Sequence, residues 1–251
     1  CMVAQSGGPT VAINASLAGV IDGVSASSMY DTVYGSLNGI TGILNDDLLN
    51  LTELMDGHPE YLSRLAQTPA MYLGSCRYKL PHYLDDDSPY VFIFKQFETY
   101  HIEAFFYIGG NDSMDTIARL AAYGAKVKSS IRFIGVPKTI DNDIYGTDVT
   151  FGFQSAINIA TEAIDCIHTT AASHNRVFIV EVMGHKVGWV TLHAGIAGGA
   201  DIILLPEIPY DIDVIAEAIN KRGKAGKHFT IIAVAEGAIS KEDAKLSKKD
   251  L

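Results

Sequence analysis

Short apolar segments alternate along this chain with segments of helical periodicity. In the helical segments, apolar residues recur three or four positions apart, as at Ile13, Leu17 and Ile21. Strands that alternate with helices pair in parallel, and the helices cover the faces of the sheet. The sequence therefore predicts an α/β fold, with candidate strands at residues 1–4, 32–34, 70–73, 104–108, 132–136, 177–182, 202–205 and 229–235.

Length and charge narrow the classes of protein that this chain can represent. Its 251 residues suffice for two α/β domains, and we place them at residues 1–141 and 142–251. The formal net charge of −10 argues against a nucleic-acid or membrane-surface binder, since either would need a basic face. Three widely separated cysteines, no visible signal peptide and no apolar stretch of membrane length lead us to expect a cytoplasmic protein.

Two glycine-rich loops follow candidate strands and precede candidate helices. Ser6-Gly7-Gly8 follows the first strand, where glycines and a helix N-terminus suit an anion, although ligand-free turns of this kind are common. In the second loop, residues 109–113 (GGNDS), Asn111 and Asp112 add oxygen ligands of the kind that magnesium prefers. We expect Ser113 to cap the following helix and Asp115 to interact with the helix dipole, and an ordinary capped turn is the alternative.

The third loop carries the densest chemistry. Residues 137–143 (PKTIDND) follow the apolar run 131–136 and bring a cation, a hydroxyl and carboxylates together. Thr139 and Asp141 can face one substrate hydroxyl, with Asp141 as general base, while Lys138 stabilises a phosphoryl group in transfer. The alternative is an Asp-Asn turn with Lys138 in solvent.

All three loops follow strands of a predicted parallel sheet. We therefore expect them to meet at one edge of that sheet, which is where open α/β sheets bind ligands. Anion-binding glycines with a lysine and a carboxylate base favour phosphoryl transfer over hydride transfer. The dinucleotide fingerprint and the full Walker pattern are both absent after the first strand.

These motifs, together with residues 180–184 (VEVMG), resemble the phosphofructokinase family in order and spacing. The resemblance implies two parallel-sheet α/β domains with the active site in the cleft between them, a diphosphate-binding first domain and a sugar-phosphate-binding second domain. ATP-dependent members typically have glycine where this chain has Asp112 and Lys138, so the sequence is similar to the pyrophosphate-dependent branch. A carboxylate at residue 112 would repel the inner phosphate of a nucleotide, and Lys138 would neutralise the compact diphosphate.

The resemblance also implies ligands and roles for individual residues. The substrates are pyrophosphate and fructose 6-phosphate, the cofactor is Mg²⁺, and the protein is a homodimer or homotetramer. Catalytic roles fall to Asp141, Lys138 and Asp112, and metal binding to Asn111 and Asp112. The diphosphate would contact Gly7, Arg77 and Ser113. The sugar phosphate would contact Thr139, Ile140, Asp141, Asp143, Met183, Gly184, His185 and Glu236, with Arg176 reaching into a neighbouring subunit; the alternative for Arg176 is a surface cation.

Three features depart from the family pattern. Asn111 replaces the usual metal-binding aspartate, and His185 stands where most members have arginine, which removes a bidentate phosphate contact. The sequence also ends soon after Glu236, so we expect a C-terminal part of the fold to be missing from it. Two alternatives stay open at this point, an ATP-dependent 6-phosphofructokinase and a non-catalytic regulatory subunit that binds sugar phosphate.

Overall fold

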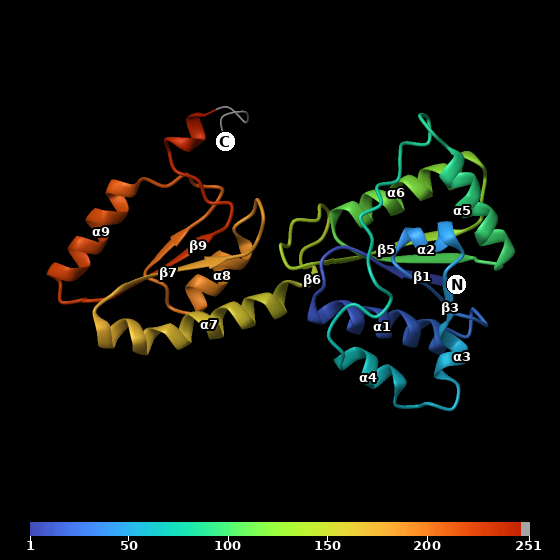
Figure 1. Ribbon diagram of the computed structural model, residues 1–251, viewed down its shortest axis with the longest axis horizontal. Coiled ribbons are helices and arrows are strands. Elements are labelled where there is room, and N and C mark those ends of the chain that lie inside the picture. The colour runs from blue at the N-terminus through green and yellow to red at the C-terminus, as the bar shows by residue number, and fades with distance from the viewer. Residues whose placement is uncertain (247–251) are drawn as a thin grey trace. The chain divides into compact units, whose positions relative to one another are not determined.

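The computed structural model describes residues 1–246 and divides into two compact units. The first unit comprises residues 1–139 and 144–152, and the second comprises residues 140–143 and the chain from 153 onward. Figure 1 labels the elements of both units. The predicted α/β class is confirmed, and the chain consists of strands that alternate with helices in each unit.

The first unit is built on a six-stranded sheet with the order β3-β2-β1-β4-β5-β6. Only β3 runs antiparallel to its neighbour. The strands are β1 (Met2–Gln5), β2 (Tyr34–Ser36), β3 (Leu48–Asn50), β4 (Ala104–Gly109), β5 (Arg132–Thr139) and β6 (Phe151–Gly152). The helices are α1 (Val11–Ser27), α2 (Ile40–Asn45), α3 (Leu51–Met55), α4 (Tyr61–Gln67), α5 (Ser88–Thr99) and α6 (Asn111–Lys126).

Both faces of this sheet are covered by helices, which explains why its central strands are apolar throughout (Figure 1). On one face, Met2 and Phe105 pack with α2, α5 and α6, and an aromatic cluster that includes Phe97 fills the space between them. On the other face, Val3 and Ile108 pack with α1, α3 and α4. The two faces take alternate residues of each strand, as the pleat requires.

The connections reverse direction beside β1. The chain leaves β1 toward β2 and later returns to place β4 on the opposite side of β1. Such a reversal leaves a crevice at the carboxyl ends of the two strands, and open α/β sheets bind ligands there. In this unit, residues 6–8 follow β1 and residues 110–112 follow β4 at the point of reversal.

The prediction of a strand at residues 70–73 is wrong. The backbone N–H groups of Tyr72 and Leu73 donate instead to the side chains of Asn14 (2.9 Å) and Gln5 (2.8 Å), so the segment needs no neighbouring strand. Conversely, the short strands β3 and β6 were not predicted. The other seven predicted strands are confirmed with shifts of at most three residues at their ends.

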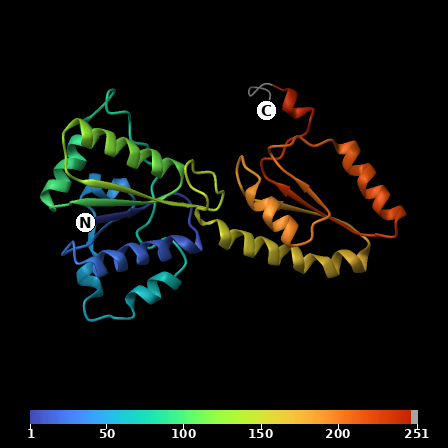
Figure 2. The same cartoon turned by 180° about the vertical axis from the view of Figure 1, so that it is seen from behind.

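The second unit contains the parallel three-stranded sheet β7-β9-β8, which Figure 2 shows from the opposite side. Its strands are β7 (Val177–Val182), β8 (Ile202–Leu204) and β9 (Thr230–Ala235). The long helix α7 (Phe153–His174) and α8 (Trp189–Ala197) pack on one face around Ile164, Ala194 and Ile231. Helix α9 (Ile212–Lys224) buries none of its residues, and a short 3₁₀ turn follows at Asp243–Lys245.

The chain passes between the units within residues 140–152. We predicted the boundary after residue 141, inside this segment. Residues 144–152 belong to the first unit, because Phe151 and Gly152 form β6 and pair with Lys138 and Thr139 of β5. Within residues 1–246, none of the helices is long and apolar enough to cross a membrane. The charged segment that we expected at residues 240–251 falls partly outside the described residues, which end at 246.

Candidate active site

The loop after β1 and the loop after β4 lie against each other at the reversal point. Gly7 has a φ of +85°, a left-handed conformation that glycine adopts without strain. A Cβ atom at Gly7 would lie 3.4 Å from the Nζ of Lys138 and 3.5 Å from the backbone N of Gly110. Two of the predicted loops and the end of β5 thus meet within the first unit, as the parallel sheet predicted.

Lys138 is buried beneath the first loop and does not extend into solvent. Its side chain is only 2% exposed, and its Nζ donates to the carbonyl oxygen of Gly8 at 2.6 Å. The alternative of an Asp-Asn turn with a solvated lysine is therefore wrong. Pairing with Phe151 of β6 extends β5 as far as this residue, which places the ammonium group at the carboxyl edge of the sheet.

The second loop leads directly into α6. The helix begins at Asn111 with Gly110 as its N-cap, so our expectation that Ser113 caps it is wrong. Ser113 is buried in the first turn, and a Cβ at Gly109 would lie 2.1 Å from its Oγ. Tight packing of this hydroxyl is the physical reason for glycine at residue 109. Asn111 and Asp112 are exposed at the helix N-terminus, where the dipole favours anions.

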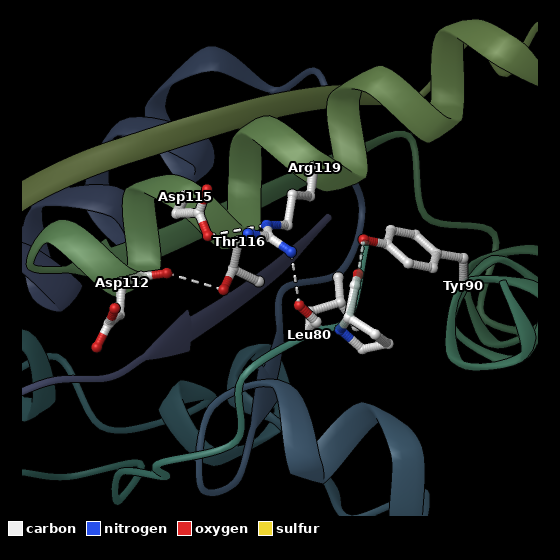
Figure 3. A network of polar contacts seen from close by, with 7 residues as sticks. Leu80, Tyr90, Asp112, Asp115, Thr116 and Arg119 are labelled. Atoms are coloured by element: carbon white, nitrogen blue, oxygen red, sulfur yellow. Dashed lines mark hydrogen bonds and ion pairs between the residues drawn. The ribbon is translucent and has the colours of Figure 1, made fainter. Parts of the chain in front are cut away.

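Asp115 is engaged in structural contacts farther along α6 (Figure 3). Its Oδ2 accepts from the Nε of Arg119 at 2.8 Å, and Arg119 also donates to the carbonyl oxygen of Leu80 at 3.0 Å. The Oγ1 of Thr116 donates to the carbonyl oxygen of Asp112. This network connects α6 to residue 80. Because the Asp112 carboxylate takes no part in it, the network is separate from the loops at the edge of the sheet.

Two serine contacts that the sequence did not predict join the first loop to the segment that carries Arg77. Ser6 Oγ donates to the carbonyl oxygen of Cys76 (3.2 Å), and Ser75 Oγ donates to that of Gly7 (3.0 Å). Burial raises the pKa of Tyr107, whose hydroxyl also forms a hydrogen bond with Ser6. No local sequence signal could have paired residues about 70 positions apart.

In the second unit, the structure brings three of the predicted sugar-phosphate residues together. The backbone N–H groups of Gly184 and His185 both donate to Oε1 of Glu236, so this carboxylate bridges the ends of β7 and β9. Met183 is next to them and is 64% exposed. Arg176 lies at the other end of β7, a six-residue strand that spans roughly 20 Å at about 3.3 Å per residue. Arg176 is thus not part of the Gly184–Glu236 group within its own chain.

The remaining predicted residues occupy the segment after β5. Thr139 is buried, and its carbonyl oxygen accepts from Thr150 Oγ1 at 2.9 Å. Ile140, Asp141 and Asp143 pack with the second unit, whereas Lys138 belongs to the first. Their roles in substrate binding and proton transfer stay predictions.

A magnesium ion would have to be held mainly by the phosphate oxygens of the bound substrate. Within residues 1–246 there is no group of three or more His, Cys, Asp or Glu side chains placed to hold a metal ion. Asn111 and Asp112 offer one amide oxygen and one carboxylate, both exposed at the helix N-terminus. This donor set fits an ion that takes one or two protein ligands and completes its shell with phosphate oxygens and water.

The sequence pattern of the family described as Phosphofructokinase matches residues 1–250. The chain belongs to the phosphofructokinase family. Among curated relatives, the ATP-dependent 6-phosphofructokinase of Spirochaeta thermophila is 42% identical over 255 residues, covering 98% of this chain and 66% of the relative. The ATP-dependent 6-phosphofructokinase 3 of Bacteroides thetaiotaomicron is 40% identical over 242 residues, covering 95% of this chain and 68% of the relative.

Solved structures of phosphofructokinases confirm the fold. A pyrophosphate-dependent phosphofructokinase from Nitrosospira multiformis matches with a TM-score of 0.84 and 32% identity. The match covers 96% of this chain and 61% of that one, so this phosphofructokinase chain is shorter than the relatives that it matches. Curated relatives and solved structures therefore agree on the family, while their names differ in the phosphoryl donor.

Proposed function

We propose that this chain is the greater part of a pyrophosphate-dependent phosphofructokinase. The enzyme transfers a phosphoryl group from pyrophosphate to the 1-hydroxyl of fructose 6-phosphate. The products are phosphate and fructose 1,6-bisphosphate, and the reaction is readily reversible because the phosphoryl transfer potentials of pyrophosphate and of the bisphosphate are similar.

The observation that carries this proposal is the buried ammonium group of Lys138. Its Nζ donates to the carbonyl oxygen of Gly8, so the cation is held directly against the first glycine loop. The group lies where two glycine loops bring backbone N–H groups to one edge of the sheet. A small, highly charged anion on these loops would lie beside this cation, and pyrophosphate fits that description.

Asp112 supports pyrophosphate over a nucleotide. Its carboxylate is exposed in the first turn of α6, where it does not pair with Arg119. A nucleotide would extend past the two transferring phosphates and bring its inner phosphate toward this negative charge. Pyrophosphate has no third phosphate, so Asp112 selects against ATP without a cost to the smaller donor.

We assign the chemical step to the segment after β5. Asp141 accepts the proton of the sugar 1-hydroxyl, and Thr139 and Asp143 orient this segment. Lys138 and Arg77 stabilise the charge on the phosphoryl group in transfer. Mg²⁺ between Asn111, Asp112 and the phosphate oxygens would supply further charge neutralisation.

The sugar phosphate is bound by the second unit in this proposal. Met183, Gly184, His185 and Glu236 would contact the sugar and its 6-phosphate. Arg176 is one strand length from this group, which supports a role in the site of a neighbouring subunit. A homodimer or homotetramer follows, because each site would need an arginine from another copy.

An ATP-dependent 6-phosphofructokinase is the second candidate. The curated relatives at 40–43% identity over nearly the whole chain are named as ATP-dependent enzymes. Identity at this level reflects the shared fold and sugar site as well as the donor site, so the residues at the two donor positions carry more weight.

The experiment that tests the proposal compares the two donors on the whole protein. Formation of fructose 1,6-bisphosphate is followed with pyrophosphate or ATP, each with Mg²⁺, and Asp141→Asn serves as the inactive control. We expect turnover with pyrophosphate and little with ATP. Strong turnover with ATP and none with pyrophosphate would reverse the assignment, and binding of fructose 6-phosphate without turnover of either donor would favour a regulatory subunit.

A further inference from the structure

Two fully buried amide side chains hold the irregular segment before Arg77. Gln5 ends β1 and Asn14 lies in the first turns of α1, so they flank the anion-binding loop, and both are 0% exposed. Gln5 Nε2 donates to Asn14 Oδ1 at 3.1 Å and also to the carbonyl oxygen of Ile13. Both amides therefore have a fixed orientation, which a buried polar group needs to be stable.

These amides supply the partners that the segment's backbone lacks. Residues 68–77 form neither a helix nor a strand. The carbonyl oxygens of Thr68 and Pro69 accept from Asn14 Nδ2, and the N–H groups of Tyr72 and Leu73 donate to Asn14 and Gln5. Because buried backbone groups must be paired, this segment depends on two side chains attached to the anion-binding loop.

Two serine hydroxyl groups attach the same segment to the anion-binding loop next to Arg77. Ser75 Oγ donates to the carbonyl oxygen of Gly7, and Ser6 Oγ donates to the carbonyl oxygen of Cys76. That last carbonyl belongs to the peptide unit that joins Cys76 to Arg77. The backbone of Arg77 is thus fixed to the loop on which the donor would lie, while its side chain is exposed.

We propose that Gln5, Asn14 and Ser75 are positioning residues, which fix the segment carrying Arg77 against the Gly7–Gly8 loop. The inference rests on the proposed function, in that Arg77 contacts the phosphoryl group in transfer. The three residues contact no reacting atom. They act by keeping the arginine and the donor loop in one rigid unit, since misplacement of a charge-stabilising group by about 1 Å costs much of its effect in the transition state.

Ser75 gives the cleanest test because it is exposed and its replacement leaves the core intact. In the whole protein, we expect Ser75→Ala to lower kcat with pyrophosphate about five- to tenfold, the range that one lost hydrogen bond allows. The KM for fructose 6-phosphate should not change. Ser75→Thr keeps the hydroxyl and should restore kcat. Ser173→Ala removes another exposed serine that donates to a carbonyl oxygen, and it should leave kcat unchanged.

A double-mutant cycle shows whether Ser75 acts through Arg77. If it does, Ser75→Ala should have no further effect on kcat in an Arg77→Ala background. Full additivity of the two losses, or an unchanged kcat for Ser75→Ala alone, would overturn the inference while leaving the proposed function in place. An unchanged kcat for Arg77→Ala would overturn both the inference and the role of Arg77.

Asn14→Asp provides an independent variant in the buried network. It keeps the acceptor for Tyr72 but loses the donor to Thr68 and Pro69. We expect faster amide hydrogen exchange in residues 68–77 and a lower kcat that is again non-additive with Arg77→Ala. Unchanged exchange in a folded Asn14→Asp protein would contradict the proposal, and if this variant does not fold, the Ser75 cycle decides alone.

Discussion

Replacement of Lys138 by methionine separates the catalytic from the structural contribution of the buried ammonium group. Methionine keeps most of the apolar stem and removes the charge. The hydrogen bond to Gly8 is lost, at a cost of about 1 kcal/mol, together with the other polar interactions of the ammonium group, while the penalty for burying a charge disappears. We therefore expect a moderate loss in the free energy of unfolding, which the thermal-unfolding measurement separates from the effect on kcat.

The effect on catalysis should be much larger. At an effective dielectric constant of about 20, a unit charge about 4 Å from another interacts with roughly 4 kcal/mol. Each 1.36 kcal/mol changes a rate about tenfold, so full loss of this stabilisation would lower kcat about a thousandfold. Part of the interaction already exists in the ground state, so we expect a loss of about 100- to 1000-fold in kcat with pyrophosphate.

The assay couples fructose 1,6-bisphosphate formation to NADH oxidation, with thermal unfolding measured on the same samples. Lys95→Met, on the exposed side of α5, is the matched control and should keep wild-type kcat. A kcat within about threefold of wild type for folded Lys138→Met would refute the reasoning, because a charge worth less than about 1 kcal/mol cannot be a main stabiliser.

Three further predictions follow from the structure. In Asp112→Gly combined with Lys138→Gly, the ratio of ATP-driven to pyrophosphate-driven rates should rise at least tenfold, and an unchanged ratio in the donor assay would remove both residues from donor selection. Glu236→Ala leaves two backbone N–H groups without their acceptor and should raise the KM for fructose 6-phosphate about tenfold. Glu236→Gln keeps an acceptor oxygen and should raise this KM less. Equal KM values for the two variants in steady-state kinetics would contradict the prediction. Gly39→Ala should destabilise the protein by about 2–3 kcal/mol in denaturant unfolding, because the new Cβ meets Cys76 Sγ at 2.9 Å at a φ of +64°. Gly57→Ala shares the positive φ without any close neighbour and should cost only about 1 kcal/mol, so equal losses would show that crowding is not the cause.

The sequence predicted the architecture wherever the signal was local. Strands β1, β4 and β9 are buried on both faces, and each is an apolar run of strand length. The segment 70–73 has the same composition but pairs with the side chains of Gln5 and Asn14, more than 50 residues away. Apolar composition alone could not distinguish these two outcomes.

The candidate site was predictable to the extent that a parallel sheet brings its carboxyl ends together. That rule placed Gly7, Gly110 and Lys138 at one edge before any geometry was known. The rule could not predict that Lys138 is buried, because a lysine in a loop is ordinarily exposed to solvent. The Ser6 and Ser75 contacts were also beyond prediction, because they depend on the path of an irregular segment.

A crystal structure of the protein with pyrophosphate and Mg²⁺ would identify the phosphoryl donor. We expect the diphosphate on the Gly7–Gly8 and Gly110 loops, with a phosphate oxygen within hydrogen-bond distance of Lys138 Nζ. An adenine nucleotide bound in the same crevice beside Asp112, in crystals that exclude pyrophosphate, would contradict it.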